Sequence, residues 1–279
     1  MSSLRALLAL EGEAATAPRD FESLRLAWYR RPAVRVATRD RLTSARLWLP
    51  ALRELEARAP DAVGSACDEA NLERAIFEAH RGRVPLSSAL RFLRAATVST
   101  KEPLFALRAG RRYGRETFDL FMRALIAQPT ANAAMHSARR FASLPVEGLE
   151  ITYLPEGAQQ RVVFTVDGGH IEEPMLAEYL LGLVGCITQQ LGGERLRILD
   201  VEFVHERRGA ARAYREAIGA PVTFGANRCS FTLPDVDLVL PDADPVLASL
   251  LEQQAEAMLE SQPRTRTHRG RVEAYLGPR

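Results

Sequence analysis

The segment from His205 to Gln262 constrains the fold more than any other part of the chain, because residues that start or end helices and strands are closely spaced in it. Gly219 to Phe224 fits a brief strand, Gly225-Ala226-Asn227 contains residues that tolerate positive φ, and Cys229 to Leu233 fits a second strand. Asp244-Pro245 then combines an N-cap residue with proline at the first helical position. We predict a strand, a helix, a hairpin, a strand, a loop and a long helix.

Alternating apolar and polar residues predict a sheet before this segment. Leu149 to Leu154 alternates, Pro155-Glu156-Gly157 supplies a turn, and Gln160 to Val166 fits the returning strand. Apolar residues at helical spacing from Glu172 to Gln190 predict a long amphipathic helix. Leu196 to His205, with few polar interruptions, predicts a central strand.

The first half of the chain has helical periodicity instead. Apolar residues recur at helical spacing between Ser44 and Pro60. Further helices are predicted at 71–80, from Pro85 onward, at 117–127 and at 131–143. The expected fold class is therefore α+β: an N-terminal helical half, then a small, mostly antiparallel sheet with packed helices, and a C-terminal helix suited to linking or dimerisation.

Charge is distributed unevenly, although the formal net charge is only +2. Residues 1–50 hold nine arginines against five acidic residues, and residues 261–279 hold five arginines against Glu273. The body between these ends is therefore acidic. Basic ends can approach nucleic acid or a membrane surface, whereas the plainer interpretation is that they are solvated and partly disordered.

These patterns suggest three segments. We predict a loosely ordered basic arm over residues 1–43, a folded domain over 44–262 and a basic tail over 263–279. Trp28 leaves open a second interpretation of the arm, because exposed tryptophan is uncommon and this residue could pack against the body.

Cysteine usage and hydropathy indicate a cytoplasmic protein. Cys67, Cys186 and Cys229 lie far apart and form no CxxC pair, which fits buried thiols in a reducing compartment. The longest apolar stretch, Tyr179 to Ile187, is much shorter than the roughly 20 residues that a membrane span needs. We therefore expect no membrane association.

The sequence lacks the motifs on which common catalytic and metal sites are built. It has no GxSxG nucleophile elbow and no P-loop. Gly182 and Gly185 lie within a predicted helix, where they favour close helix packing over phosphate binding. The chain leaves open a Cys–His pair formed by folding, but Cys186 lies on an apolar helix face that disfavours a thiolate. The histidines, none at metal-ligand spacing, are His80, His136, His170, His205 and His268. We predict no enzymatic activity, no metal site and no cofactor.

Three stretches resemble the effector-binding half of AraC/XylS-type transcription regulators, called the arabinose-binding-type domain. They are Val84-Pro85-Leu86 followed by a helix, Ala124 to Thr130 followed by an alanine-rich helix, and the order of elements from His205 to Gln262. The resemblance spans residues 46–262 and is best over 196–262.

The resemblance implies the ligand-sensing and dimerising part of a DNA-binding regulator that controls transcription in response to a small molecule. Arg271 to Arg279 is similar to the helix that precedes the family's two helix-turn-helix units, and no such unit follows it. DNA binding is therefore expected only through a domain outside this chain. The alternative is a free-standing small-molecule-binding or interaction protein that titrates full-length relatives by mixed dimers.

Five residues are predicted to line the effector pocket, between the sheet and the long helix, because aromatic and polar side chains gather there. They are Tyr179, Phe203, His205, Tyr214 and Phe224. Alternative roles remain open for two of them. His205 could be a structural, hydrogen-bonded histidine, and Phe224 belongs to the predicted turn.

The C-terminal helix is predicted to form a homodimer. Leu247, Leu251, Gln254 and Met258 follow one another at spacings of four, three and four residues, which is a heptad-like stripe. Val246, Leu250 and Ala257 form a neighbouring stripe, so one face can dock on the parent domain while the other meets a partner. The plainer alternative is that the whole helix packs only on its own domain.

Overall fold

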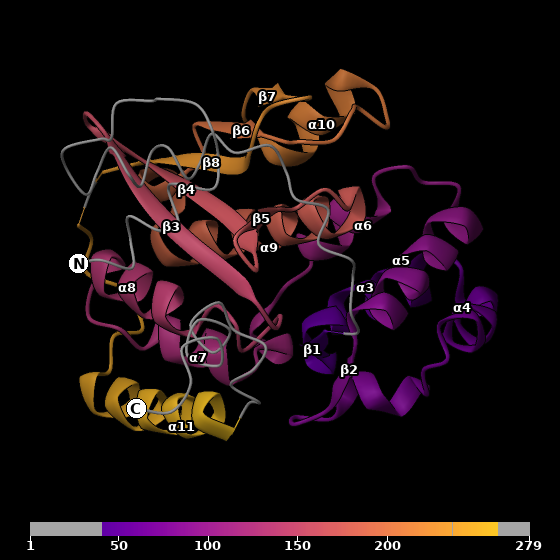
Figure 1. Ribbon diagram of the computed structural model, residues 1–279, viewed down its shortest axis with the longest axis horizontal. Coiled ribbons are helices and arrows are strands. Elements are labelled where there is room, and N and C mark those ends of the chain that lie inside the picture. Colours follow the sequence, from indigo (N-terminus) through magenta and orange to yellow (C-terminus); the bar gives the residue numbers. More distant parts are fainter. Residues whose placement is uncertain (1–40, 236, 262–279) are drawn as a thin grey trace, which may run out of the picture. The chain divides into compact units, whose positions relative to one another are not determined.

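The computed structural model describes residues 41–235 and 237–261 of the chain. The predictions for a basic arm and a basic tail concern residues that lie mostly outside these ranges. The described part is α+β, as predicted, with helices around one main sheet (Figure 1). Its first described element, β1 (Leu42–Ser44), begins inside the segment predicted as arm.

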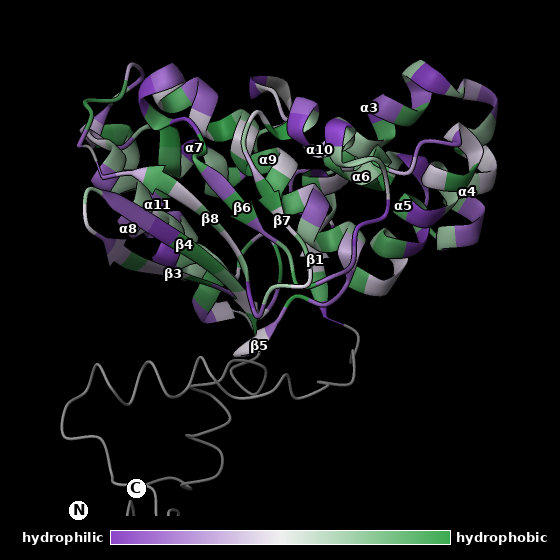
Figure 2. Ribbon diagram, turned by 90° about the horizontal axis from the view of Figure 1, so that it is seen from above, coloured by the Kyte–Doolittle hydropathy of each residue, from purple (hydrophilic) through white to green (hydrophobic). Residues whose placement is uncertain are grey.

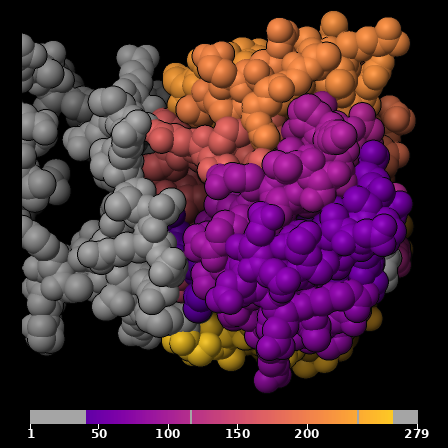
Figure 3. Space-filling model, turned by 90° about the vertical axis from the view of Figure 1, so that its right-hand side faces the viewer, coloured from indigo at the N-terminus to yellow at the C-terminus, as the bar shows by residue number. Residues whose placement is uncertain are grey.

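The N-terminal half is built from short helices, because prolines and left-handed residues interrupt it repeatedly. Residues of this half, coloured indigo to magenta, cover much of the face seen in Figure 3. The helix predicted over 71–80 is present only as the 3-10 helix η3 (Arg74–Glu78), because Asn71 ends the preceding helix α4 (Val63–Ala70) in the left-handed conformation with φ 54°. The elements are η1 (Ala45–Trp48), α3 (Leu49–Arg58), η2 (Pro60–Ala62), α4 (Val63–Ala70), η3 (Arg74–Glu78), α5 (Leu86–Thr100), α6 (Phe105–Gly110), η4 (Arg115–Thr117), α7 (Leu120–Ile126) and α8 (Ala131–Phe141).

A two-stranded antiparallel sheet joins the start of this half to the turn before α5. It pairs β1 with β2 (Arg83–Pro85), so Leu42 lies opposite Pro85. Pro85 is the N-cap of α5, so the helix begins at Leu86, one residue later than predicted. Strands of three residues carry too few alternations to be found from sequence.

The main sheet has the strand order β3-β4-β8-β6-β7, with the short β5 added beside β4. All of its pairs are antiparallel except β6 with β7. The predicted hairpin between β7 and β8 was wrong, because β6 lies between them, and the predicted central strand over 196–205 shortens to β6. The strands are β3 (Leu149–Glu156), β4 (Gln159–Val166), β5 (Gly169–His170), β6 (Asp200–Glu202), β7 (Val222–Thr223) and β8 (Cys229–Pro234).

The central helix α9 (Pro174–Gly192) lies against this sheet and is largely hydrophobic (Figure 2). It crosses α6 so closely that a Cβ built on Gly182 would lie 2.2 Å from the carbonyl oxygen of Leu107. The prediction that Gly182 serves close helix packing is thus confirmed. Three shorter segments complete the fold: η5 (Gly193–Leu196), α10 (Ala211–Ile218) and α11 (Pro245–Ser261).

Two predicted helix starts are confirmed by their capping hydrogen bonds. The side chain of Thr130 accepts a hydrogen bond from the backbone amide of Ala133 and begins α8. Asp244 Oδ1 accepts one from the amide of Leu247 at 3.0 Å and begins α11. The rest of α11 lies against α7 and α8, with Ala248 and Ala255 buried at the contact (Figure 1).

Candidate functional site

A cavity of about 120 Å³ lies between α9 and the main sheet, closed at the side by α7 and α8. Twenty-four residues line it, and none of them is charged. From the helices these are Phe121, Met122 and Leu125 (α7), Ala131, Ala134, Met135 and Ala138 (α8), and Leu180, Leu183, Val184, Ile187, Thr188 and Leu191 (α9). From the sheet they are Leu149, Ile151, Tyr153, Val162, Phe164, Phe231 and Leu233, and Leu47, Tyr113, Pro145 and Leu196 complete the wall.

Three polar side chains interrupt this apolar wall. The Thr188 hydroxyl donates to the carbonyl oxygen of Gly185 within its own helix. Burial raises the pKa of Tyr153 above its ordinary value. The Tyr113 hydroxyl is fully buried and has no hydrogen-bond partner among residues 41–235 and 237–261. A buried polar group of this kind costs free energy until something pairs with it.

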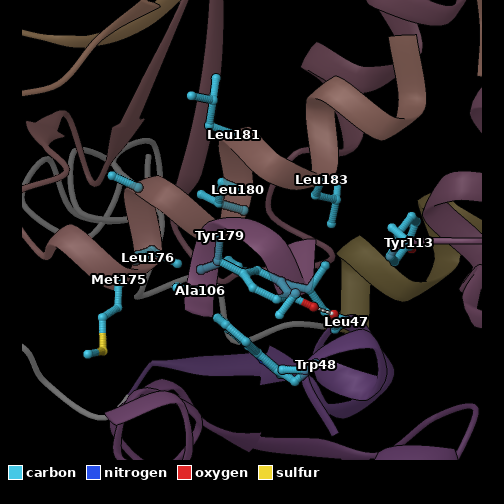
Figure 4. Packing of buried hydrophobic residues seen from close by; sticks show 14 of the residues in the cluster. Leu47, Trp48, Ala106, Tyr113, Met175, Leu176, Tyr179, Leu180, Leu181 and Leu183 are labelled. Carbon is cyan, nitrogen blue, oxygen red and sulfur yellow. Dashed lines mark hydrogen bonds between the residues drawn. The ribbon is translucent and has the colours of Figure 1, made fainter. Parts of the chain in front are cut away.

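The position of Tyr113 is fixed through its backbone. Its carbonyl oxygen accepts hydrogen bonds from Cys186 Sγ and from Gln190 Nε2, both at 2.9 Å and both from α9. Its ring lies 5.3 Å from the ring of Phe118. In Figure 4 Tyr113 lies across from Leu183 of α9. The tyrosine is therefore held at the end of the cavity near the start of α7.

The opening of the cavity is marked by the lining residues that remain partly exposed. These are Met135, Ile151, Tyr153, Val184, Ile187 and Leu191. They belong to α8, to β3 and to the C-terminal half of α9, so the opening lies among these three elements. Tyr153 is the polar side chain at this opening, whereas Tyr113 is buried.

Tyr179 was predicted to line the pocket, and the structure places it in the core beside the cavity instead. Its ring stacks on Trp48 with a centroid distance of 4.7 Å. Its hydroxyl donates a hydrogen bond to the carbonyl oxygen of Leu47 (Figure 4). Tyr179 therefore joins α9 to the N-terminal helical half, and its polar group is already satisfied.

The other four predicted residues do come together, but they form an aromatic cluster without a cavity, beside Glu178 in the N-terminal half of α9. The rings of Phe203 and His205 are 4.7 Å apart, and those of Tyr214 and Phe224 are 4.8 Å apart. The structure places none of the four on the wall of the cavity. The cavity lies between the same elements as the predicted pocket, the sheet and the long helix, but its wall includes none of the five predicted residues.

Glu178 of α9 is the charged residue inside this cluster, and it is completely buried. Tyr214 donates to its Oε1 at 2.5 Å, and Arg208 Nη1 donates to its Oε2 at 3.3 Å. Burial raises the pKa of Glu178 to about 7, against the opposing effects of Tyr214 and Arg208. Burial likewise lowers the pKa of His205, whose Nε2 lies 3.9 Å from Glu178 Oε1.

The stripe predicted for dimerisation is divided between two faces of α11. Met258 and Ala255 pack against the core of the parent domain. Leu251 is partly buried and Ala248 is buried. Leu247 and Gln254 are exposed. The large apolar side chains left on the free face are Val246 (72% exposed), Leu247 (44%) and Leu250 (58%).

The cavity wall and α11 are joined by polar contacts. Glu252 Oε1 accepts hydrogen bonds from Gln128 Nε2 at 2.9 Å and from Ser137 Oγ at 2.8 Å. Arg140 of α8 forms an ion pair with Glu256. The backbone amide of Asp244 donates to the carbonyl oxygen of Ala127 at 2.9 Å. The helices α7 and α8 therefore contact the cavity on one side and α11 on the other.

The family model for the arabinose-binding domain of AraC transcription regulators, an N-terminal domain, matches residues 62–241. The chain belongs to this family. The match covers the cavity-forming elements from α7 to β8, and it confirms the resemblance that the sequence had suggested. An arabinose-binding-type domain is the effector-binding part of a transcription regulator, which gives this chain a ligand-sensing role in regulation.

A solved structure shares the fold of this arabinose-binding-type domain. The crystal structure of the transcriptional regulator CdpR from Pseudomonas aeruginosa aligns with a TM-score of 0.51 and 14% sequence identity, covering 84% of this chain and 71% of that chain. At this identity the likeness concerns the fold alone. A comparison with curated proteins finds no match.

The described part of the arabinose-binding-type domain contains neither a cluster of possible metal ligands nor a helix that could span a membrane. No three His, Cys, Asp or Glu side chains within residues 41–235 and 237–261 are grouped so that they could bind a metal ion. None of the helices in these same ranges has both the length and the hydropathy of a membrane span.

The sequence carried one signal for part of the cavity wall, although this signal could not separate a cavity from a packed core. Val184, Ile187 and Leu191 recur at helical spacing along α9, continue its apolar face and yet stay partly exposed. Apolar residues at helical spacing predict a buried helix face. The pattern therefore does not distinguish a face that packs against the core from a face that lines a cavity.

Proposed function

We propose that the domain binds a small-molecule effector in the cavity between α9 and the sheet and transmits this binding to α11, as the regulatory half of an AraC-type regulator. The observation that carries the proposal is the double contact of α7 and α8, which line the cavity and also bind α11. In this scheme DNA is read by helix-turn-helix units outside the chain, as the family implies.

The coupling follows from the spacing of the two wall helices. A ligand that fits the cavity better in one spacing of α7 and α8 shifts the population toward that spacing. Glu252 accepts hydrogen bonds from Gln128 beyond α7 and from Ser137 of α8, so a change in spacing alters these bonds. Ligand binding is therefore expected to change amide hydrogen exchange along α11.

Filling the cavity tests where the effector binds. In Ala134→Leu the longer side chain occupies part of the cavity, because Ala134 is buried and lines it. Compounds from a metabolite screen that raise the melting temperature of the parent by several degrees are expected to lose this effect in the variant. The measurement is a thermal-shift titration.

Ala133→Leu is the matched control, since Ala133 lies on the same helix and does not line the cavity. It should keep the ligand-induced rise in melting temperature. Equal stabilisation of parent and Ala134→Leu by the same compounds would show that they bind elsewhere and would contradict the proposed site.

We also propose that α11 pairs with α11 of a second copy. The free face carries Val246, Leu247 and Leu250 with Gln254 in line behind them, a narrow apolar stripe interrupted by one polar residue. Such a stripe fits a helix of the same kind, and a polar residue within it fixes the register of the pair. The docked face, with Ala248 and Ala255, is already occupied by α7 and α8.

Leu250→Glu is expected to convert a dimer into a monomer in light scattering, because it places a charge in the proposed contact. Leu250 is 58% exposed, so the fold of the protomer should persist, with an unchanged far-UV spectrum. Leu251→Glu is a less suitable variant, because Leu251 is already partly buried within the protomer. A parent that is monomeric at high micromolar concentration would exclude the dimer and leave the ligand site unaffected.

A further inference from the structure

We infer that the cavity accepts an uncharged, mainly apolar molecule with one hydrogen-bond acceptor, which the hydroxyl of Tyr113 binds. The inference rests on the proposed function, since it names the ligand class of the same cavity. A carbonyl, ether or hydroxyl oxygen on an aromatic ring or a short alkyl chain meets this description, whereas a carboxylate does not.

The lining excludes ionised ligands. Not one of the 24 residues on the wall carries a charge. Moving an ionised group from water into such surroundings is strongly unfavourable unless a charged partner or several hydrogen bonds compensate. The polar hydroxyls here belong to Tyr113, Tyr153 and Thr188, and Thr188 already donates within its helix. The wall therefore selects against a carboxylate or an ammonium group.

The hydroxyl of Tyr113 is the buried polar group of the cavity wall that lacks a hydrogen-bond partner within the described ranges. The Tyr113 side chain is completely buried. An acceptor on the ligand would satisfy this hydroxyl in the complex, so ligand binding would remove a cost that the free protein bears. An apolar ligand of the same shape would leave the cost in place.

The surroundings of Tyr113 keep it a donor. Burial, and next the nearby carboxyl of Asp119, raise the pKa of Tyr113 well above its ordinary value, and the backbone of Asp119 and the charge of Arg46 oppose this. Asp119 is itself buried at the N-cap of α7, where its side chain accepts a hydrogen bond from the amide of Met122 at 3.1 Å. A ligand carboxylate bound to Tyr113 would therefore lie near a second acidic group.

The cavity volume indicates the size of ligand that fits without rearrangement of the wall. An apolar cavity of about 150 Å³ in another protein binds benzene. The cavity here, at about 120 Å³, is of the same order. A single aromatic ring with a small substituent is therefore a suitable probe, and wall residues at the opening, such as Met135, can adapt to a longer one.

Three probes of nearly equal shape test the inference: acetophenone with a neutral acceptor, ethylbenzene with none, and benzoate with a charge. Calorimetric titration of the parent is expected to show acetophenone binding about three- to tenfold more tightly than ethylbenzene, and no benzoate binding at neutral pH. Tyr113→Phe should bring the affinities for acetophenone and ethylbenzene together. Tyr153→Phe, at the opening, should preserve their ratio.

The outcomes separate this inference from the proposed function. If ethylbenzene binds the parent but not Ala134→Leu, the cavity is a ligand site, and an unchanged acetophenone preference in Tyr113→Phe then overturns only the role of Tyr113. Benzoate binding as tightly as acetophenone overturns the uncharged ligand class. If neither neutral probe binds the parent, the cavity assignment of both proposals is wrong. Folding of Tyr113→Phe is checked by its melting temperature, expected to equal or exceed that of the parent because an unpaired hydroxyl is removed.

Discussion

Replacing Gly182 by alanine is expected to lower the free energy of unfolding by about 3 kcal/mol, at the upper end of what overpacking costs. The added Cβ would lie 2.2 Å from the carbonyl oxygen of Leu107 and 3.1 Å from the amide nitrogen of Arg111. Both are backbone atoms, so no side-chain rotation relieves the clash, and α6 and α9 must move apart. Gly110 occupies the same crossing from the other side, with its Cβ position 2.2 Å from the carbonyl oxygen of Tyr179.

Gly185→Ala, one turn further along α9, is the matched control. Its Cβ would meet Arg111 Nη1 at 3.4 Å and Ile198 Cδ1 at 3.7 Å, which are ordinary contacts or nearly so. Alanine also favours a helix interior over glycine by about 1 kcal/mol. Urea unfolding followed by circular dichroism should therefore show a large loss for Gly182→Ala and little or none for Gly185→Ala. Similar midpoints for the two variants would refute the close crossing.

Replacing Glu178 by glutamine is expected to remove a loss of stability that the parent suffers as the pH rises from about 4.5 to about 7. Burial raises the pKa of Glu178 to about 7 in the folded protein, from 4.5 as its ordinary value. In this window the folded state holds a proton that the unfolded state has released, so stability falls with increasing pH. The total loss is about 3 kcal/mol by the usual conversion of pKa shifts.

Glutamine stays neutral and can still accept the hydrogen bond that Tyr214 donates to Glu178. Unfolding free energies measured from pH 4 to 8 should thus decline more in the parent than in Glu178→Gln. His205 contributes the opposite slope, because burial lowers its pKa. Both proteins retain His205, so the difference between their profiles reports on Glu178. Parallel profiles would mean that Glu178 is ionised in the folded state at low pH.

The sequence could predict the parts of the fold whose signals are local. Thr130 and Asp244 mark the starts of α8 and α11 because a short oxygen-bearing side chain caps the first free amides. The β3–β4 hairpin follows from alternation around Gly157. The helix expected over 71–80 shortened to the 3-10 helix η3 for a local reason as well, since Asn71 adopts a left-handed conformation that ends α4.

The strand order and the cavity could not be predicted in the same way. β7 and β8 are close in sequence, which favoured a hairpin, yet β6 pairs with both of them. Phe203, His205, Tyr214 and Phe224 were correctly expected to meet, but whether aromatic side chains meet around a ligand or around one another depends on how completely they fill the space. Here they fill it, around the buried Glu178.

By itself the sequence determined the α+β class and the helix that carries the free apolar face, because composition, spacing and capping act over neighbouring residues. The family was indicated by the resemblance of this sequence to known regulators. Only the tertiary structure decided where space remains. The cavity exists because α7, α8, α9 and three strands, far apart along the chain, meet without filling the volume between them. Its buried hydroxyl, that of Tyr113, is unpaired for the same reason: packing of distant elements, and no local pattern, fixes what lies opposite it.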